Sequence, residues 1–226
     1  MESRFEEFKK IILGRAKEAS ACTEQYRRAY SSESFKELTT VIRDNFFWCV
    51  DNDVITGELI DEYKKEFADG GIWHNENVTE GYMIATGSAT VKASGSATVR
   101  AFDNVTVEAF NNVTVKASGS ATVKAFNNVT VEATGSATVR AYDNVTVEAF
   151  NNVTVDASGS ATVDASDNVT VDATGSATVN AFGSAYVNTI SSIECKLSDC
   201  AIARVNNNKI CYASDNLKFE KIEEQK

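Results

Sequence analysis

From Gly87 to Ile190, apolar and polar positions repeat every eight residues through thirteen consecutive octads without an insertion. We letter each octad a to h. Positions c, e and g hold Ala or Val almost throughout, d is nearly always Thr, and f is usually charged. This alternation predicts a short strand whose c, e and g side chains point inward. Positions a and b hold Gly, Ser, Asn or Asp, which favour turns. The stretch therefore predicts a mainly β fold, a parallel β-solenoid of stacked octads.

The cross-section of this solenoid is either two or three octads per rung. Val and Ala fill the narrow space between two flat faces, whereas a triangular rung of three octads normally needs larger residues inside. Two octads per rung also align Lys92, Glu108 and Lys124 as alternating charges, whereas three align Lys92, Lys116 and Arg140 as like charges. We therefore favour two octads per rung and keep three as the alternative.

A longer duplication lies above the octad. Residues 95–134 match residues 135–174 at 34 of 40 positions, and the block contains five octads. Because five is not a multiple of two or three, a copied octad must occupy a different face from its original. The differences fall only at positions a, f and h. The octad is therefore the interchangeable unit, and any function of the rod is encoded at its outward positions.

The segment before the solenoid, residues 1–80, has helical spacing. Ser3 with Glu6 and Ser34 with Glu37 match the capping box at a helix start, and Thr56 begins a further helix. We expect three or four short helices in this segment, acting as an N-terminal cap or a binding domain.

After the last octad the pattern weakens. An alternating strand is expected at 193–197, a hairpin from 201–205 and 209–212, and another alternation at 217–222. We divide the chain into a helical segment (1–80), the octapeptide-repeat solenoid (81–190) and a C-terminal β cap (191–226).

Composition and net charge limit the classes of protein to which this chain can belong. The net charge of -10 argues against electrostatic binding to a nucleic-acid backbone. No apolar run approaches the roughly 18 residues that span a bilayer, and the first residues do not resemble a secretory signal. The five cysteines contain no C-x-x-C pair, so we interpret them as reduced, mostly buried thiols. We expect a soluble, cytoplasmic protein with no membrane contact.

The sequence offers little chemistry. His74 is the single histidine, so no histidine cluster can hold a metal, and no Cys spacing matches a zinc site. A Cys-His catalytic pair is conceivable, but a histidine with a structural role in the cap is the simpler interpretation. We expect no enzyme activity, no metal and no cofactor.

The charge of the rod changes along its length. Residues 87–142 hold five basic and three acidic residues, whereas residues 143–190 hold six acidic residues and no basic one. Neutral drift explains this pattern as well as function does. The functional interpretation is an acidic end that docks into a basic groove, because stacked like charges cost stability. The candidate contact residues at position f are Glu148, Asp156, Asp164 and Asp172.

Aromatic residues recur at position h, at the corner of the octad. Stacking between neighbouring rungs explains them simply, but exposed aromatic rings in a row would mark a protein-contact surface. The candidates are Phe102, Phe110, Phe126, Tyr142, Phe150 and Phe182.

The octads GSATVRAF, DNVTVEAF and NNVTVKAS resemble those of uncharacterised octapeptide-repeat proteins of gut bacteria and their phages or mobile elements. The flanking segments DNDVITGELIDEYKKEF and SSIECKLSDCAIARV are similar to those that bracket such repeats, and the resemblance spans residues 36–222. It implies a β-solenoid with non-repetitive ends and an accessory protein of a phage or mobile element. It implies no activity.

Together these features lead us to expect a non-enzymatic solenoid that binds a macromolecule. The first hypothesis is an accessory or inhibitor protein that engages a host protein with a basic groove and resembles a DNA mimic in its acidity. The alternative is a scaffold that assembles into a dimer or fibre. Ice binding is less favoured, because each column of Thr lies beside a charged column.

Overall fold

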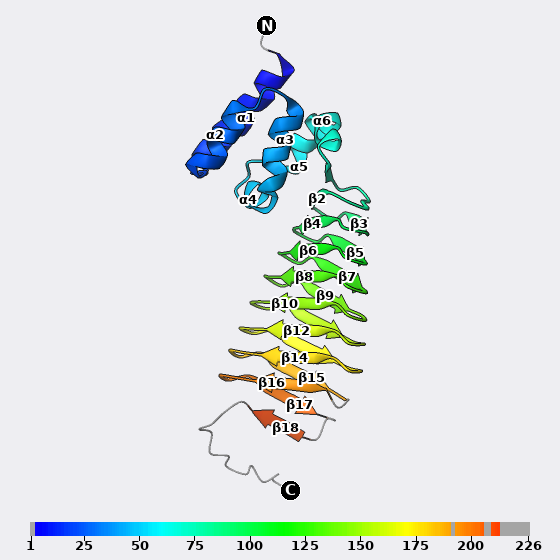
Figure 1. Ribbon diagram of the computed structural model, residues 1–226. Helices are drawn as coiled ribbons and strands as arrows, with labels where there is room; N and C mark the ends of the chain where they lie inside the picture. Colours follow the sequence, from blue (N-terminus) through cyan, green and yellow to red (C-terminus); the bar gives the residue numbers. More distant parts are fainter. Residues whose placement is uncertain (1–2, 191–192, 206–208, 213–226) are drawn as a thin grey trace.

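The octads form the strands of two parallel sheets stacked face to face, with six helices at one end (Figure 1). The structure is a computed structural model and describes residues 3–190, 193–205 and 209–212. Sheet A has the order β1 (Ile72–His74), β2 (Tyr82–Ala85), β4 (Thr98–Ala101), β6 (Thr114–Ala117), β8 (Thr130–Ala133), β10 (Thr146–Ala149), β12 (Thr162–Ala165), β14 (Thr178–Ala181) and β16 (Glu194–Leu197). Sheet B has the order β3 (Thr90–Ala93), β5 (Thr106–Phe110), β7 (Thr122–Phe126), β9 (Thr138–Ala141), β11 (Thr154–Ala157), β13 (Thr170–Ala173), β15 (Tyr186–Thr189), β17 (Ile202–Val205) and β18 (Lys209–Tyr212).

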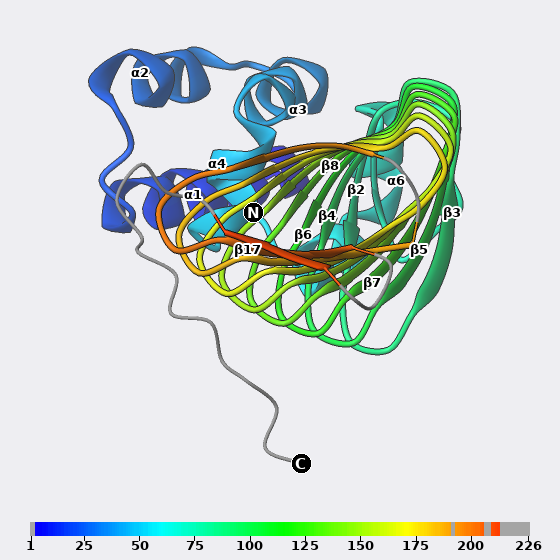
Figure 2. The same cartoon turned by 90° about the horizontal axis from the view of Figure 1, so that it is seen from below.

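The pairing register confirms two octads per rung. Val147 aligns with Val131 on one side and with Val163 on the other, so each residue meets its counterpart two octads away. Inward positions c, e and g are almost completely buried from Ala97 onward, whereas d and f are partly or fully exposed. The flattened rung in Figure 2 follows from these small residues, because Val and Ala fill only a thin space between the sheets.

The turns explain why position a accepts only Gly, Asp or Asn. Gly119, Gly159, Asn127 and Asp143 all have φ near +60° to +70°. Only Gly adopts this backbone freely, and Asn and Asp tolerate it better than other residues do. Each octad therefore turns at the same point, and the register is kept along the rod.

The helical segment has six helices within the described residues, more than the three or four expected. These are α1 (Arg4–Glu18), α2 (Thr23–Ser31), α3 (Phe35–Asp44), α4 (Phe46–Asp51), α5 (Gly57–Glu62) and α6 (Lys64–Asp69). The expected caps are present, since Ser3, Ser34 and Thr56 each accept a hydrogen bond from the amide three residues later. The extra elements are α4, which the sequence analysis did not mark, and a break at Tyr63 that divides the expected last helix in two.

The helices pack on the outer side of sheet A at its first rungs. Tyr82 and Ile84 of β2 and the corner residue Phe102 join the hydrophobic core of the helical segment. The rings of Phe46 and Tyr82 lie 4.9 Å apart between their centroids. Seen along the rod, α1 to α4 extend past one margin of the solenoid (Figure 2). The helical segment thus covers part of one face as well as the end of the rod.

The sheets extend beyond both boundaries drawn from the octads. At the start, β1 lies within residues 1–80 but pairs in parallel with β2 and belongs to sheet A. At the other end, β16 and β17 continue the parallel stacking after residue 190. The expected hairpin is confirmed, because β17 and β18 pair antiparallel. The alternation expected at 217–222 lies outside the described residues.

Candidate functional site

The f column of sheet A changes from apolar to basic to acidic as it leaves the helices. Ile84, Arg100, Lys116, Glu132, Glu148, Asp164 and Asn180 align in this order from β2 to β14. Ile84 is buried in the core of the helical segment. The residues of this column from Arg100 onward determine the charge that this face presents to solvent.

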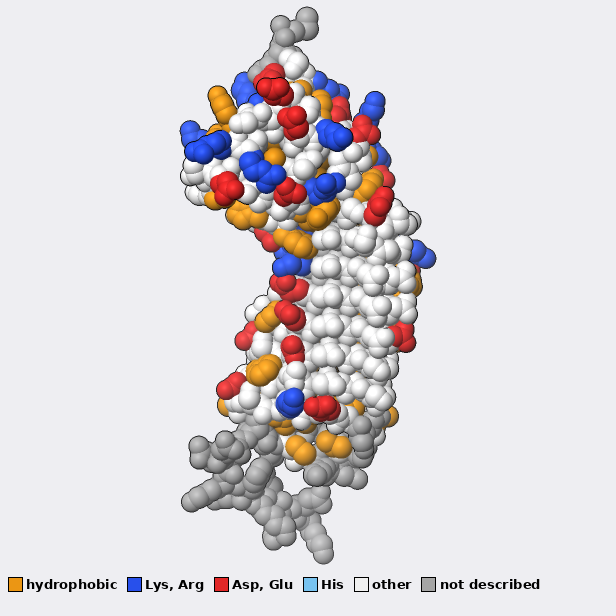
Figure 3. Space-filling model, in the orientation of Figure 1, with side chains coloured by type: hydrophobic (Ala, Val, Ile, Leu, Met, Phe, Trp, Pro, Cys, Tyr) orange, Lys and Arg blue, Asp and Glu red, His pale blue; other side chains and the backbone are white. Residues whose placement is uncertain are grey.

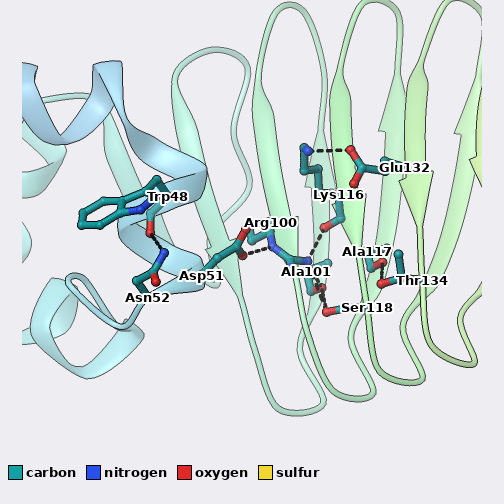
Figure 4. Close-up of polar contacts among 10 residues, drawn as sticks. All are labelled: Trp48, Asp51, Asn52, Arg100, Ala101, Lys116, Ala117, Ser118, Glu132 and Thr134. Carbon is teal, nitrogen blue, oxygen red and sulfur yellow. Dashed lines mark hydrogen bonds and ion pairs between the residues drawn. The ribbon is translucent and has the colours of Figure 1, made fainter. Parts of the chain in front are cut away.

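Arg100 and Lys116, the two basic residues nearest the helices, serve the contact with them. The Arg100 Nε lies 2.6 Å from Asp51 Oδ1 of α4 (Figure 4). The guanidinium of Arg100 also lies 4.2 Å from the centre of the Phe102 ring. Its side chain is only 14% exposed. One rung further, Lys116 forms an ion pair with Glu132 and lies 4.9 Å from the centre of the Phe47 ring. The basic half of the column is therefore explained by the docking of the helical segment.

The acidic residues beyond this contact form a ladder of like charges. Glu132, Glu148 and Asp164 occupy directly neighbouring strands, about 4.8 Å apart. Glu132 is paired with Lys116, and Asp164 accepts a hydrogen bond of 2.6 Å from Asn180 Nδ2. Glu148 is exposed and has neither an ion pair nor a hydrogen bond to any described residue. The ladder thus has an ion pair at Glu132, a hydrogen bond from a neutral amide at Asp164, and no compensation at Glu148.

Two exposed aromatic rings flank this ladder. Phe150 follows β10 and is 38% exposed, and Phe182 follows β14 and is 43% exposed. Acidic and hydrophobic side chains gather along one margin of the rod below the helices (Figure 3). We call the set Glu132, Glu148, Asp164, Phe150 and Phe182 the acidic edge. It combines uncompensated charge with exposed apolar surface, which are both properties of a protein-contact surface.

Most charges in the f column of sheet B are paired within that column. Glu108 lies between Lys92 and Lys124, with N–O distances of 3.3 and 3.2 Å. Hydrogen bonds from these two lysines, the one from Lys124 first, lower the pKa of the Glu108 carboxyl. Arg140 Nε lies 3.4 Å from Asp156 Oδ2. At the far end, Asp172 accepts a hydrogen bond from Asn188 Nδ2.

The four acidic candidates from the sequence therefore do not form one surface. Glu148 and Asp164 lie on sheet A, whereas Asp156 and Asp172 lie on sheet B, on the opposite side of the rod. Equivalent positions of successive octads alternate between faces, so one flat partner cannot contact all four. The sequence analysis missed Glu132 as a member of the ladder, although its place two octads before Glu148 marks it.

The aromatic candidates are also divided. Phe110, Phe126 and Tyr142 stack along the edge of sheet B, with ring centroids 5.0 and 4.8 Å apart and nearly parallel planes. Phe102 packs under the helices. Stacking between rungs, the simpler of the two interpretations, thus accounts for three of the rings. Phe150 and Phe182 are left as large exposed aromatic side chains on the rod.

A cleft with a volume of about 600 Å^3 lies where the helices meet the first rungs. The residues that line it include the apolar Ile55, Ile84 and Phe102 and the acidic Asp51, Asp53, Glu58 and Asp103. Arg100, already paired with Asp51, also lines it.

His74 lies beside this cleft in a hydrogen-bonded chain. Its Nδ1 is 3.0 Å from Asp61 Oδ2, and its Nε2 is 2.9 Å from Thr86 Oγ1, which is the order of groups found in hydrolytic triads. However, the amide of Thr86 donates to Asn75 Oδ1 and that of Gly87 donates to Asp103 Oδ2. These two amides are therefore not free to stabilise an oxyanion. These two hydrogen bonds of His74 connect Asp61 of α5 with Thr86, the residue after β2.

The cysteines differ from the expectation that most are buried. Only Cys49 is buried, and burial raises the pKa of its thiol to about 12. Cys195 and Cys211 are half-buried, and Cys22 and Cys200 are exposed. In the part of the chain that the structure describes, no group of three or more His, Cys, Asp or Glu residues is arranged to hold a metal ion. Cys195, Cys200 and Cys211 all belong to the end of the rod that lies away from the helices.

Comparison with protein-family models, with curated proteins and with solved structures gave no match. None of the described helices is both long and apolar enough to cross a bilayer. The resemblance to octapeptide-repeat proteins therefore stays a prediction, and the surface of the molecule carries the functional proposal.

Proposed function

We propose that this chain is a non-enzymatic β-solenoid that binds another protein through its acidic edge. The observation that carries the proposal is Glu148, an exposed carboxylate between two acidic neighbours with no partner of its own among the described residues. Aligned like charges on neighbouring strands are unfavourable. A partner that brings positive charge to the ladder removes this cost.

The chemistry of the partner follows from the shape of the edge. Carboxylates about 4.8 Å apart in a line fit Lys or Arg side chains presented by a basic groove. Phe150 and Phe182 lie beside the charges and are exposed. Their rings can add short-range apolar contacts to the electrostatic attraction between the ladder and a basic partner. We propose a host protein as the partner and an accessory or inhibitor role of the phage or mobile-element type, acting in the cytoplasm. The free thiols support a reducing compartment.

A comparison of the two faces tests this proposal. Glu148→Lys with Asp164→Lys reverses the ladder on sheet A, and Asp156→Lys with Asp172→Lys makes the same change of charge on sheet B. Partners are captured from a host lysate, identified, purified and then titrated against each variant. We expect the sheet A variant to bind at least about 10-fold more weakly, and the sheet B variant to bind nearly as wild type. Circular dichroism checks that both variants are folded.

Equal loss in both variants would mean that only net charge matters, as for a DNA mimic that uses both faces. No loss in the sheet A variant would exclude the acidic edge as the contact surface. Either result contradicts the proposal as stated.

Self-assembly is the second candidate, and the exposure of Phe150 and Phe182 favours it. In this case two copies bury these rings against each other, because exposed aromatic rings gain from burial. Analytical ultracentrifugation would then show oligomers that Phe150→Ser with Phe182→Ser disperses, while Phe110→Ser, within the stack on sheet B, leaves them intact. A monomer at every concentration removes this candidate.

Ice binding is a weaker candidate on the observed surface. Thr130, Thr146 and Thr162 do align on sheet A, but the acidic ladder runs beside them. Hydrated carboxylates next to the column prevent a flat and weakly hydrated surface.

A further inference from the structure

Two cysteines lie at the end of the solenoid that the helices do not cover. Cys195 is in β16, the last described strand of sheet A, and Cys211 is in β18, the last described strand of sheet B. In Figure 1 these strands close the lower end of the rod. The two positions lie close in the sequence, but they belong to opposite sheets because β18 turns back antiparallel beside β17.

The register directs both side chains toward the interior. Cys195 aligns with Val179, which is completely buried between the sheets. Cys211 aligns with Ala203, which in turn aligns with the buried Val187. Aligned residues of paired strands project to the same side of a sheet. Each thiol therefore continues an inward column of its own sheet, and the two columns face each other.

The two thiols share one environment. Both are half-buried and pack against the same hydrophobic core of the rod. Burial, and after it the neighbouring Cys211 thiol, raises the pKa of Cys195. No further described strand of sheet A lies beyond β16, so the β17–β18 hairpin can lean toward Cys195 without displacing another described strand.

We propose that Cys195 and Cys211 form a disulfide that closes this end of the solenoid when the protein meets a disulfide oxidant such as oxidised glutathione. One thiolate attacks the glutathione disulfide, forms a mixed disulfide and expels a glutathione thiolate. The second protein thiolate then attacks the protein sulfur of the mixed disulfide and expels the other glutathione thiolate. Two thiol protons pass to the two glutathione thiolates. The protein is oxidised by two electrons, and the glutathione disulfide is reduced.

The bond would add a second covalent link between the sheets at this end, where the turn from β16 to β17 is the first. The last described strand of sheet A would be linked to the hairpin of sheet B, and the segment between the two cysteines would become a closed loop. Such a link removes open conformations of the end, because neither strand can separate alone. In a reducing compartment the pair stays as thiols, as the structure shows them.

Oxidation of the full-length protein tests the proposal. The reduced protein is incubated with oxidised glutathione, free thiols are blocked, and peptides are mapped by mass spectrometry without reduction. We expect a cross-linked pair of peptides that contain Cys195 and Cys211, with the loss of two hydrogen atoms. The cross-link is expected to persist in Cys200→Ser and to be absent in Cys195→Ser and Cys211→Ser.

Hydrogen exchange gives an independent readout. We expect amides of β16 and β17 to exchange roughly 100-fold more slowly after oxidation, and to return to their original rates with dithiothreitol. The Cys200 thiol, exposed in the turn between these strands, is the natural competitor. A Cys195–Cys200 bond, a bond between two chains, or glutathione held on Cys195 without closure would each overturn the proposal.

Discussion

At the scale of single residues, the outward charges of sheet B begin as a ladder of alternating sign, formed by Lys92, Glu108 and Lys124. Glu108 receives hydrogen bonds from Lys124 and Lys92, and these lower its pKa. A spacing of two octads was sufficient to predict that Lys92, Glu108 and Lys124 align. The sequence did not reveal the contacts of Arg100, because its partner Asp51 is 49 residues away in an unpredicted helix.

The pKa of Glu108 makes the stability of the rod depend on pH. Because the folded pKa is below the unfolded value of about 4.3, the carboxylate contributes stability above that pH. This contribution is lost as the pH falls through the folded pKa. We expect Glu108→Gln to melt below wild type at about pH 7 and to lose this difference at about pH 2. Thermal unfolding across this range measures it.

Glu148→Gln is the control for this prediction. Glu148 lies between two acidic residues, so removing its charge should not lower the melting temperature at neutral pH. A deficit of Glu108→Gln that stays constant down to the lowest pH would show that the lysine contacts are not its cause.

At the scale of elements, the duplicated block shows that the two faces of the rod are equivalent. The octad at 95–102 forms β4 in sheet A, and its copy at 135–142 forms β9 in sheet B. The identical inward residues fit both sheets because each sheet offers the same Val and Ala surface. The alternation of apolar positions was therefore enough to predict the strands, the register and the core.

The helical elements were harder to predict for a local reason. Tyr63 continues the apolar spacing of the helix that begins at Thr56, but its backbone leaves the helical conformation and separates α5 from α6. The ring of Tyr63 is buried against Phe8 of α1, with centroids 4.8 Å apart. A tertiary contact thus overrides the local pattern, which sequence spacing alone does not reveal.

The turn at position a gives a test at this scale. Gly159 has φ +69°, and a Cβ added there would lie 2.8 Å from the backbone nitrogen of Asp143. We expect Gly159→Asn to cost about 1 kcal/mol or less, because Asn127 and Asp143 already adopt this conformation at equivalent turns. Gly159→Val should cost about 2 kcal/mol or more, since a β-branched residue is strained at positive φ.

Urea unfolding of the two variants separates the effects of conformation and of space. Equal destabilisation by Asn and Val would indicate that the contact with Asp143, rather than the backbone conformation, limits this position.

At the scale of the whole molecule, the helical segment and the rod are joined by contacts on the outer side of sheet A. Arg100 contributes an ion pair and a ring contact to this junction. We expect Arg100→Ala to weaken the docking of the helices by about 1–3 kcal/mol. Hydrogen exchange should show faster exchange in α4 and α5 and unchanged rates from β8 to β14.

Lys92→Ala is the matched control, because its ion pair with Glu108 lies on sheet B. It should leave the exchange of α4 and α5 unchanged. Uniformly faster exchange along the rod in Arg100→Ala would show that the two parts unfold as one unit.

The candidate site was only partly predictable from the sequence. The acidic character of the second half was visible, but its division between two faces depends on the number of octads per rung. Glu148 and Asp156 occupy the same position in successive octads and lie on opposite sides of the rod. With two octads per rung established, the positions of Glu132, Glu148 and Asp164 in alternate octads identify them as one line.

Because the octads are interchangeable, the exposed surface of this chain can change while its core stays the same. Deleting one octad between the helices and Glu132 would leave every inward column intact, because all octads have nearly the same core residues. It would nevertheless move every later residue to the other sheet, so the acidic edge would lie on the face away from the helices. Deleting two octads would restore the face and only shorten the rod. Natural variants that differ by an odd number of octads would therefore present different surfaces to a partner at nearly constant stability.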